Sequence, residues 1–136
     1  MSGTIPGSRI AVINDDTAFL DLMRDLLEDE SYAVMICREW DHAYEFVKTR
    51  RPDLVILDIR LGGEERGWNI LNLLTLDPTT RPTPLIVCSA AVQSLHDHQE
   101  LLTRYGIRAL PKPFDVDALL RTVEETLLDR RQERPI

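Results

Sequence analysis

Polar side chains suited to phosphoryl chemistry stand where short apolar runs end. Asn14 and Asp15 follow the first run, Asp58 ends the third, Ser89 ends the fourth and Lys112 follows the fifth. Two carboxylates in one crevice need a neutralising cation, and their hard oxygen ligands suit Mg²⁺. A lysine ammonium group and a serine hydroxyl group can hold a phosphoryl oxygen. These residue types predict a magnesium site in which Asp58 is a carboxylate nucleophile that forms an aspartyl phosphate.

The elements expected to position these groups are strands alternating with helices. Apolar runs rich in branched residues predict five strands, at 9–14, 32–37, 54–58, 84–89 and 108–111. Between them, apolar residues recur at the three- and four-residue spacing of a helix face, and Asp16 and Thr17 are candidate N-caps of the first helix. The expected core-facing residues are Phe19, Leu22, Met23, Leu26 and Leu27 in the first helix, Trp40, Ala43, Tyr44 and Val47 in the second, Trp68, Ile70, Leu71 and Leu74 in the third, Leu95, Leu101 and Leu102 in the fourth, and Val116, Leu119, Leu120, Val123 and Leu127 in the fifth.

This alternation predicts an α/β fold with a doubly wound, five-stranded parallel sheet and five helices. The near-continuous apolar strands indicate a sheet covered on both faces. Ligands bind such a sheet outside the carboxyl ends of its strands, where the polar residues above lie. Taken singly, Asp15 or Asp16 could cap a helix, Ser89 could bond to its own backbone and Lys112 could be a solvated surface residue. Their joint placement favours a shared site.

Chain length and composition narrow the class of protein. With 136 residues, 43% hydrophobic and 29% charged, the chain is expected to form one globular domain. A net charge of −7 argues against direct nucleic-acid binding, and no apolar run is long enough for membrane insertion. The first residues do not read as a signal peptide, which predicts a cytoplasmic protein. Cys37 and Cys88 are expected to be small buried hydrophobes. We expect a disordered leader at 1–8, the domain at 9–128 and a short tail at 129–136.

Four stretches resemble the motifs of the response regulator receiver domain, the CheY-like phosphoacceptor of two-component signalling. They are "VINDD", "PDLVILDIRL", "PLIVCSA" and "LPKPF", and the resemblance covers roughly residues 9–128. It implies a flavodoxin-like fold with strand order 2-1-3-4-5. It also implies that Asp58 accepts a phosphoryl group from a histidine kinase or phosphotransfer protein and that the chain signals to an unidentified downstream protein. The chain is not expected to be an enzyme. At most, it would catalyse its own phosphoryl transfer and its own dephosphorylation.

The same resemblance assigns roles to the other polar residues. Asp15 binds Mg²⁺ together with the acceptor carboxylate, and the backbone carbonyl of Arg60 completes the metal site. Ser89 and Lys112 contact the phosphoryl group, and the bond between Lys112 and Pro113 is expected to be cis. The implied partner surface is formed by the fourth helix, the fifth strand and the fifth helix.

Asn14 departs from the family pattern, which usually has two acids after the first strand. Taking Asp15 as the second acid turns the apolar face of the first helix toward the core, whereas taking Asp16 would turn Arg24 there. Asn14 then stands in the position of the first acid, where it can hydrogen-bond a metal-bound water but brings no charge. We expect weaker Mg²⁺ binding, not its loss.

Two further departures concern signal output and the surroundings of the acceptor. Ala109 stands where the family usually carries an aromatic residue that swings inward on phosphorylation, so the usual switch with Ser89 cannot operate. The stretch "GGEERG", Gly62 to Gly67, replaces the usual turn with a longer loop beside the acceptor. This loop is expected to alter partner choice or the access of water to the phosphoryl group.

Two other classes of protein are alternatives to a phosphoacceptor. Haloacid-dehalogenase-like phosphatases carry a second acid two residues after the nucleophile, and Arg60 occupies that position here. The more serious alternative is a pseudo-receiver, which binds proteins without being phosphorylated. Asn14 and Ala109 favour it. The residues that oppose it are Asp15, Asp58, Ser89 and Lys112. The preferred interpretation is a stand-alone receiver that works by phosphorylation-dependent protein binding or as a relay intermediate.

Overall fold

The computed structural model describes residues 7–133, whose centre is one parallel β-sheet. Within this range the strands are β1 (Arg9–Ile13), β2 (Ala33–Cys37), β3 (Leu54–Asp58), β4 (Leu85–Ser89) and β5 (Arg108–Pro111). Every neighbouring pair is parallel, and the order is β2-β1-β3-β4-β5. β3 and β4 are buried along their whole length, as expected of strands that are apolar on both faces. The predicted fold class and strand order are confirmed.

Six α-helices, not the expected five, lie within the described residues. They are α1 (Thr17–Glu28), α2 (Ala43–Arg50), α3 (Gly67–Leu76), α4 (Val92–Asp97), α5 (Gln99–Tyr105) and α6 (Val116–Glu133), and a short 3₁₀ helix, η1 (Trp40–His42), precedes α2. The expected fourth helix divides at His98, whose backbone has φ −104° and ψ 15°. The His98 ring contacts the Ser94 carbonyl oxygen at 2.8 Å and stacks on Trp68.

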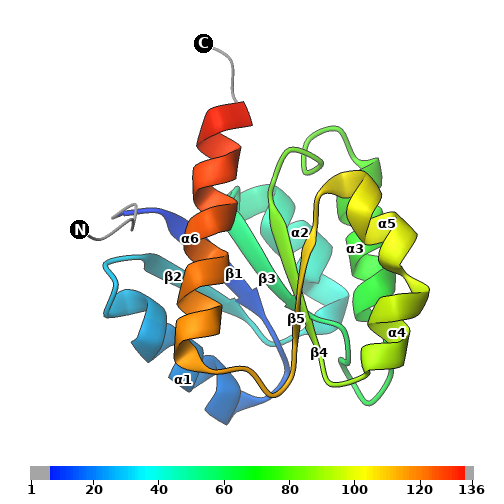
Figure 1. Ribbon diagram of the computed structural model, residues 1–136, viewed down its shortest axis with the longest axis horizontal. Coiled ribbons are helices and arrows are strands. Elements are labelled where there is room, and N and C mark those ends of the chain that lie inside the picture. Colours follow the sequence, from blue (N-terminus) through cyan, green and yellow to red (C-terminus); the bar gives the residue numbers. More distant parts are fainter. Residues whose placement is uncertain (1–6, 134–136) are drawn as a thin grey trace.

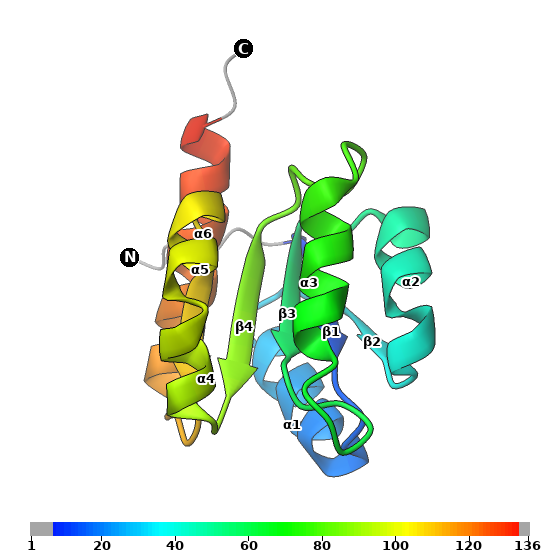
Figure 2. The same ribbon diagram turned by 90° about the vertical axis from the view of Figure 1, so that its right-hand side faces the viewer.

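Helices cover both faces of the sheet, as Figures 1 and 2 show. Side chains from α2, α3, α4 and α5 form one apolar cluster with the sheet, and those from α1 and α6 form the other. Within residues 7–133, no helix combines the length and apolar character needed to cross a membrane.

The buried stripe of α1 differs from the expected one. Leu20, Met23 and Leu27 are buried, whereas Leu22 is 54% exposed. The helix carries enough apolar residues for two overlapping stripes, and packing selects the one that contains Leu20. Val116 and Trp40, also expected in the core, are likewise exposed, whereas the third helix buries Trp68 as expected.

The ends of the domain are fixed by backbone and ionic contacts. Ser8, which was assigned to the leader, is buried, and its carbonyl oxygen accepts a 2.9 Å hydrogen bond from Ala33 N–H. Helix α6 continues to Glu133, past the expected boundary at 128. Within that extension, Arg130 contacts the Asp53 carboxylate at 3.1 Å, which joins α6 to the start of β3. The rest of the expected leader and tail, 1–6 and 134–136, lies outside the described residues.

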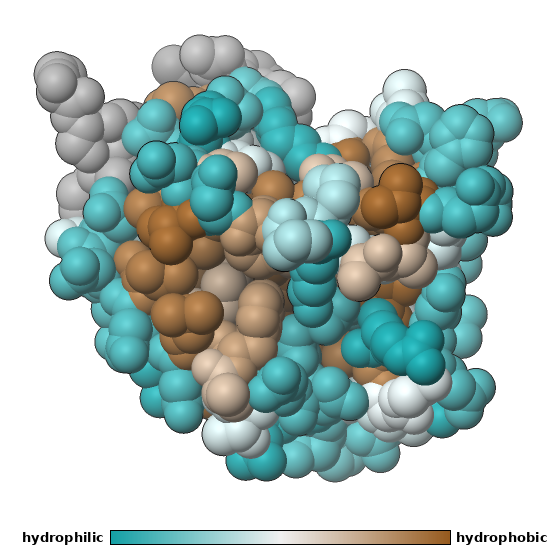
Figure 3. Space-filling model, turned by 60° about the horizontal axis from the view of Figure 1, so that its bottom comes forward, coloured by the Kyte–Doolittle hydropathy of each residue, from teal (hydrophilic) through white to brown (hydrophobic). Residues whose placement is uncertain are grey.

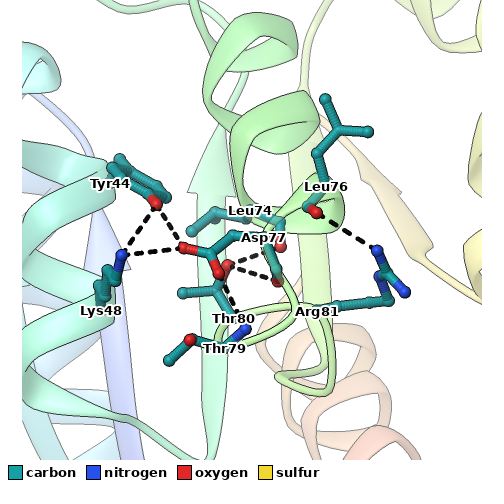
Figure 4. Close-up of polar contacts among 8 residues, drawn as sticks. All are labelled: Tyr44, Lys48, Leu74, Leu76, Asp77, Thr79, Thr80 and Arg81. Atoms are coloured by element: carbon teal, nitrogen blue, oxygen red, sulfur yellow. Dashed lines mark hydrogen bonds and ion pairs between the residues drawn. The ribbon is translucent and has the colours of Figure 1, made fainter.

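A polar cluster joins α2 to the end of α3 (Figure 4). The Tyr44 hydroxyl group donates a hydrogen bond to Asp77, and the Lys48 ammonium group lies 3.2 Å from the same carboxylate. The other oxygen of Asp77 accepts a 2.9 Å bond from Thr79 N–H, which shapes the turn after the helix. Because α3 runs antiparallel to the strands, this cluster lies at the opposite edge of the sheet from their carboxyl ends.

Candidate functional site

The carboxyl ends of the strands surround an open cleft of about 530 Å³. Register places Asp58 beside Cys88 and Ser89 beside Pro111, so the ends of β3, β4 and β5 are level. Figure 3 brings this edge forward and shows hydrophilic side chains next to an area of hydrophobic ones. All six residues predicted for the site line the cleft: Asn14, Asp15, Asp58, Arg60, Ser89 and Lys112.

Asp58 is buried at the end of β3, with one carboxylate oxygen paired and the other not. Its Oδ2 atom accepts hydrogen bonds from Asn14 Nδ2 at 2.7 Å and from the Lys112 ammonium group at 2.9 Å. Its Oδ1 atom is buried and has no hydrogen-bond partner among residues 7–133. A buried carboxylate oxygen without a partner is costly, so Oδ1 is suited to bind a cation or to react.

Two hydrogen-bond partners fix the orientation of the Asn14 amide group, because one binds its nitrogen and the other binds its oxygen. Its Nδ2 atom donates to the Asp58 carboxylate, and its Oδ1 atom accepts a 2.8 Å bond from Asp16 N–H. A carboxylate can only accept and a backbone N–H can only donate, so the orientation of the amide is determined. Asn14 therefore holds Asp58 in place without adding a negative charge to the cleft.

The two aspartates after Asn14 have different roles. Asp16 is the N-cap of α1, because its Oδ1 atom accepts from Ala18 N–H at 3.0 Å and from Phe19 N–H at 3.3 Å. Asp15 is exposed, and its Oδ2 atom accepts a 2.7 Å bond from Gly62 N–H in the loop after β3. The capping role thus falls on Asp16, and Asp15 is the acid presented to the cleft.

Ser89 and Lys112 approach the cleft from neighbouring strands. The Ser89 hydroxyl oxygen accepts a 3.0 Å bond from Ala91 N–H, and the Ser89 carbonyl accepts a 2.9 Å bond from Lys112 N–H. The Lys112 ammonium group lies 4.7 Å from the centre of the Phe19 ring, a cation–π contact that restricts its direction. The bond between Lys112 and Pro113 is cis, as expected.

Six other residues line the cleft, and sequence reasoning placed none of them there: Asp16, Phe19, Gly63, Glu65, Ala90 and Ala91. Phe19 was assigned to the core face of the first helix, but its position in the first turn of α1 brings it under Lys112. Gly63 and Glu65 belong to the loop after β3. The sequence indicates that this loop is unusual, but it does not show which of its residues turn inward.

The loop after β3 packs closely against its surroundings at Gly62 and at Gly67. Gly62 has φ +61°, and a Cβ atom there would lie 3.0 Å from Trp40 Nε1 and 3.2 Å from Arg66 Nε. The Arg66 guanidinium group in turn lies 4.1 Å from the centre of the Trp40 ring. At Gly67 a Cβ atom would lie 2.5 Å from the Ile59 Cα atom and 2.6 Å from the Asp58 carbonyl oxygen. Only glycine permits this approach of α3 to the strand that carries Asp58.

The residues of the cleft fit a hard divalent cation. Asp15 and Asp58 contribute negative charge, and the unpartnered Oδ1 atom of Asp58 offers a ligand position. Within the described part of the chain, no three His, Cys, Asp or Glu side chains form a group able to hold a metal ion. A cation bound here would therefore have two carboxylate ligands at most, with backbone and water oxygens as the others. Mg²⁺ commonly keeps several waters, so this donor set suits it.

The chain belongs to the response regulator receiver domain family, whose sequence model matches residues 10–124. It is thus a receiver domain of two-component signalling, as the sequence motifs indicated.

Two relatives and one solved structure illustrate the similarity. The chain is 29% identical over 130 residues to the nitrogen assimilation regulatory protein NtrX of Azorhizobium caulinodans, with 93% of this chain and 28% of NtrX covered. It is 27% identical over 121 residues to the polar-differentiation response regulator DivK of Brucella anthropi, with 88% of this chain and 96% of DivK covered. The chain therefore spans under a third of NtrX and nearly all of DivK. A similar fold is found in the receiver domain of sensor histidine kinase PA1611 from Pseudomonas aeruginosa PAO1, with a TM-score of 0.75 and 21% sequence identity. The match covers 89% of this chain and 98% of that one. The PA1611 receiver domain has a magnesium ion coordinated in its active-site cleft.

Proposed function

We propose that Asp58 accepts a phosphoryl group from the phosphohistidine of a sensor histidine kinase or phosphotransfer protein, in a reaction that requires Mg²⁺. The observation that carries this proposal is the state of the Asp58 carboxylate. One oxygen is held by Asn14 and Lys112, while the other is buried without a partner among residues 7–133 and borders an open cleft. A carboxylate that is fixed in position but incompletely paired is suited to nucleophilic attack.

The transfer is a displacement at phosphorus. A carboxylate oxygen of Asp58 forms a bond to the phosphorus atom while the phosphorus–nitrogen bond of the phosphohistidine breaks, and the electron pair of that bond stays on the imidazole nitrogen. Lys112, 2.9 Å from Asp58, balances the negative charge of the phosphoryl oxygens. The Ser89 hydroxyl oxygen accepts its bond from Ala91 N–H through a lone pair, so its own O–H group can donate to a phosphoryl oxygen.

The proposed metal ligands are the carboxylates of Asp15 and Asp58 and the backbone carbonyl of Arg60, with Asn14 bonded to a metal-bound water. These residues would hold Mg²⁺, whose positive charge would stabilise the negative charge of the phosphoryl oxygens. The magnesium ion in the cleft of the PA1611 receiver domain supports the choice of metal. Hydrolysis of the phosphoryl group is self-catalysed in this proposal, and the phosphorylated form signals by binding a downstream protein.

The test is incubation with acetyl phosphate and MgCl₂, followed by intact mass spectrometry. We expect one phosphoryl adduct on the wild-type chain, none on Asp58→Asn, and an unchanged adduct on the control Asp25→Asn, whose side chain is exposed on α1. Omitting Mg²⁺ should suppress the adduct. A wild-type chain without an adduct, or an adduct that survives Asp58→Asn, would refute the proposal. The former result would favour a pseudo-receiver that binds proteins without phosphorylation.

A further inference from the structure

Four residues join the loop beside the acceptor to the helices α4 and α5, and we call them the Glu65 cluster: Glu65, Trp68, Ser94 and His98. Glu65 Oε1 accepts a 2.6 Å hydrogen bond from the Ser94 hydroxyl group and a 3.2 Å bond from Trp68 Nε1–H. Trp68 Nε1 also lies 2.9 Å from Ser94 Oγ. The His98 ring stacks on Trp68, with the ring centroids 3.7 Å apart and the planes at 10°. The indole group is thus held at its edge and on one face.

The cluster connects the cleft with the joint between two helices. Glu65 lines the cleft, and Trp68 lies buried in the first turn of α3. Ser94 belongs to α4, and His98 is the residue at which α4 ends and α5 begins. A change in the position of the Glu65 carboxylate therefore acts on α4 through Ser94 and on the α4–α5 joint through Trp68 and His98.

A second set of hydrogen bonds connects the cleft to α4, through the residues that follow β4. The Ser89 hydroxyl oxygen accepts from Ala91 N–H at 3.0 Å, and the Ala91 carbonyl accepts from Leu95 N–H in α4 at 3.2 Å. Two cleft-lining segments, one after β3 and one after β4, thus converge on α4. At the position where an aromatic switch would stand, Ala109 is exposed and offers only a methyl group.

We infer that Glu65 senses the charge of the Asp58 cleft and transmits it to α4 and α5 through Ser94 and Trp68. This inference rests on the proposed function for its physiological trigger. An aspartyl phosphate carries more negative charge than the carboxylate it replaces, and like charges in one cleft repel. The Glu65 carboxylate then moves, and Trp68 Nε1–H loses an acceptor. Ser89 acts in the same direction, because turning to the phosphoryl group weakens its bond to Ala91.

The indole N–H resonance of Trp68 in a ¹H–¹⁵N spectrum reports this contact directly. The chain has two tryptophans, and the Trp68 resonance is the one that disappears in Trp68→Phe. Glu65→Gln removes the charge and keeps an acceptor oxygen. Glu64→Gln is the matched control, because it makes the same change one residue earlier, where the carboxylate pairs with Arg66 and is 71% exposed.

The experiment has one arm with phosphorylation and one without. In the first, acetyl phosphate and Mg²⁺ are added, and intact mass is measured on the same samples. In the wild type and in Glu64→Gln, we expect the Trp68 resonance to shift further than it does with Mg²⁺ alone. In Glu65→Gln, at an equal yield of adduct, the shift should be less than half of the wild-type shift. In the second arm, Asp58→Asn removes one negative charge from the cleft without any donor. It should shift the resonance, and adding Glu65→Gln should cut that shift by more than half.

The two proposals fail in different ways. If the chain gains no adduct but Asp58→Asn still shifts Trp68 through Glu65, the charge coupling stands and the phosphoacceptor function is refuted. If the adduct forms and the Trp68 shift is the same in Glu65→Gln as in the wild type, the phosphoacceptor function stands and the role of Glu65 is refuted. A Trp68 resonance that does not move in either arm also refutes the role of Glu65.

Discussion

Asn14 donates a 2.7 Å hydrogen bond to the same oxygen of Asp58 that Lys112 contacts. A carboxylate at position 14 could not donate this bond, and it would repel Asp58. The amide therefore stabilises the Asp58 carboxylate when no metal is bound, but it brings no negative charge that would attract a cation. The carboxylates expected to bind a cation are Asp15 and Asp58, which both line the cleft, and a third carboxylate at position 14 would bind a divalent cation more strongly.

Asn14→Asp is predicted to tighten Mg²⁺ binding by roughly tenfold, about 1.4 kcal/mol, because it adds a charged oxygen ligand. Without the metal the same change should lower the free energy of unfolding, since the new carboxylate repels Asp58. Isothermal titration with MgCl₂ and urea unfolding in EDTA measure the two effects. Asn14→Ala is the control and should not tighten binding. Equal Mg²⁺ affinity for Asn14→Asp and the wild type would contradict the proposed place of position 14 beside the metal.

Gly67→Ala is predicted to destabilise the domain by about 3 kcal/mol or more, because the new methyl group overlaps the backbone of Ile59 and Asp58. Gly63→Ala is the matched control in the same loop. Gly63 has φ +77°, and a Cβ atom there meets nothing within 4 Å among the described residues, so the cost should be about 1 kcal/mol. Urea unfolding compares the two variants. Similar costs for both would mean that α3 can move away from β3 without loss.

Residues at the ends of buried strands were predictable from sequence, because apolar runs mark the strands and a parallel sheet brings their carboxyl ends to one edge. Asp58, Ser89 and Lys112 were placed in this way. The rotation of α1 was not predictable, since Leu20 and Leu22 both fit an apolar face and only packing decides between them. The division of the fourth helix falls at His98, whose ring stacks on Trp68, and a contact between residues so far apart in the sequence leaves no local pattern.

Loop residues carry no periodic signal, so their direction is set by tertiary contacts. The composition of "GGEERG" indicated an unusual loop. It did not distinguish Glu64, which pairs with Arg66 at the surface, from Glu65, which turns into the cleft toward Ser94. The sequence reasoning therefore placed Asp58 and its hydrogen-bond partners Asn14 and Lys112 in one cleft and missed the connection from the cleft to α4.

Cys88 is predicted to be unreactive in the folded protein. Burial raises the pKa of its thiol group to about 12, with a further rise from the negative charge of Asp58 that Lys112 partly offsets. The thiolate is the reactive form, so labelling should require opening of the sheet. In Cys37→Ser, where Cys88 is the only remaining cysteine, an aromatic disulfide reagent at neutral pH should label the unfolded chain rapidly and the folded chain only at the rate of opening. Equally fast labelling of both would contradict its burial.

Asp77 is predicted to make the stability of the domain depend on pH in the acid range. The hydrogen bond from Tyr44 is the main cause that lowers the pKa of this carboxyl group to about 2, below its ordinary value of 3.8. The folded state therefore releases this proton more readily than the unfolded state does. The resulting stabilisation is complete above about pH 4 and is lost as the pH falls toward about 2. Urea unfolding across this range should show a shallower loss of stability for Asp77→Asn than for the wild type. Tyr44→Phe removes the main donor and should also flatten the dependence, whereas a slope unchanged in both variants would show that the contact in Figure 4 does not depend on the charge of Asp77.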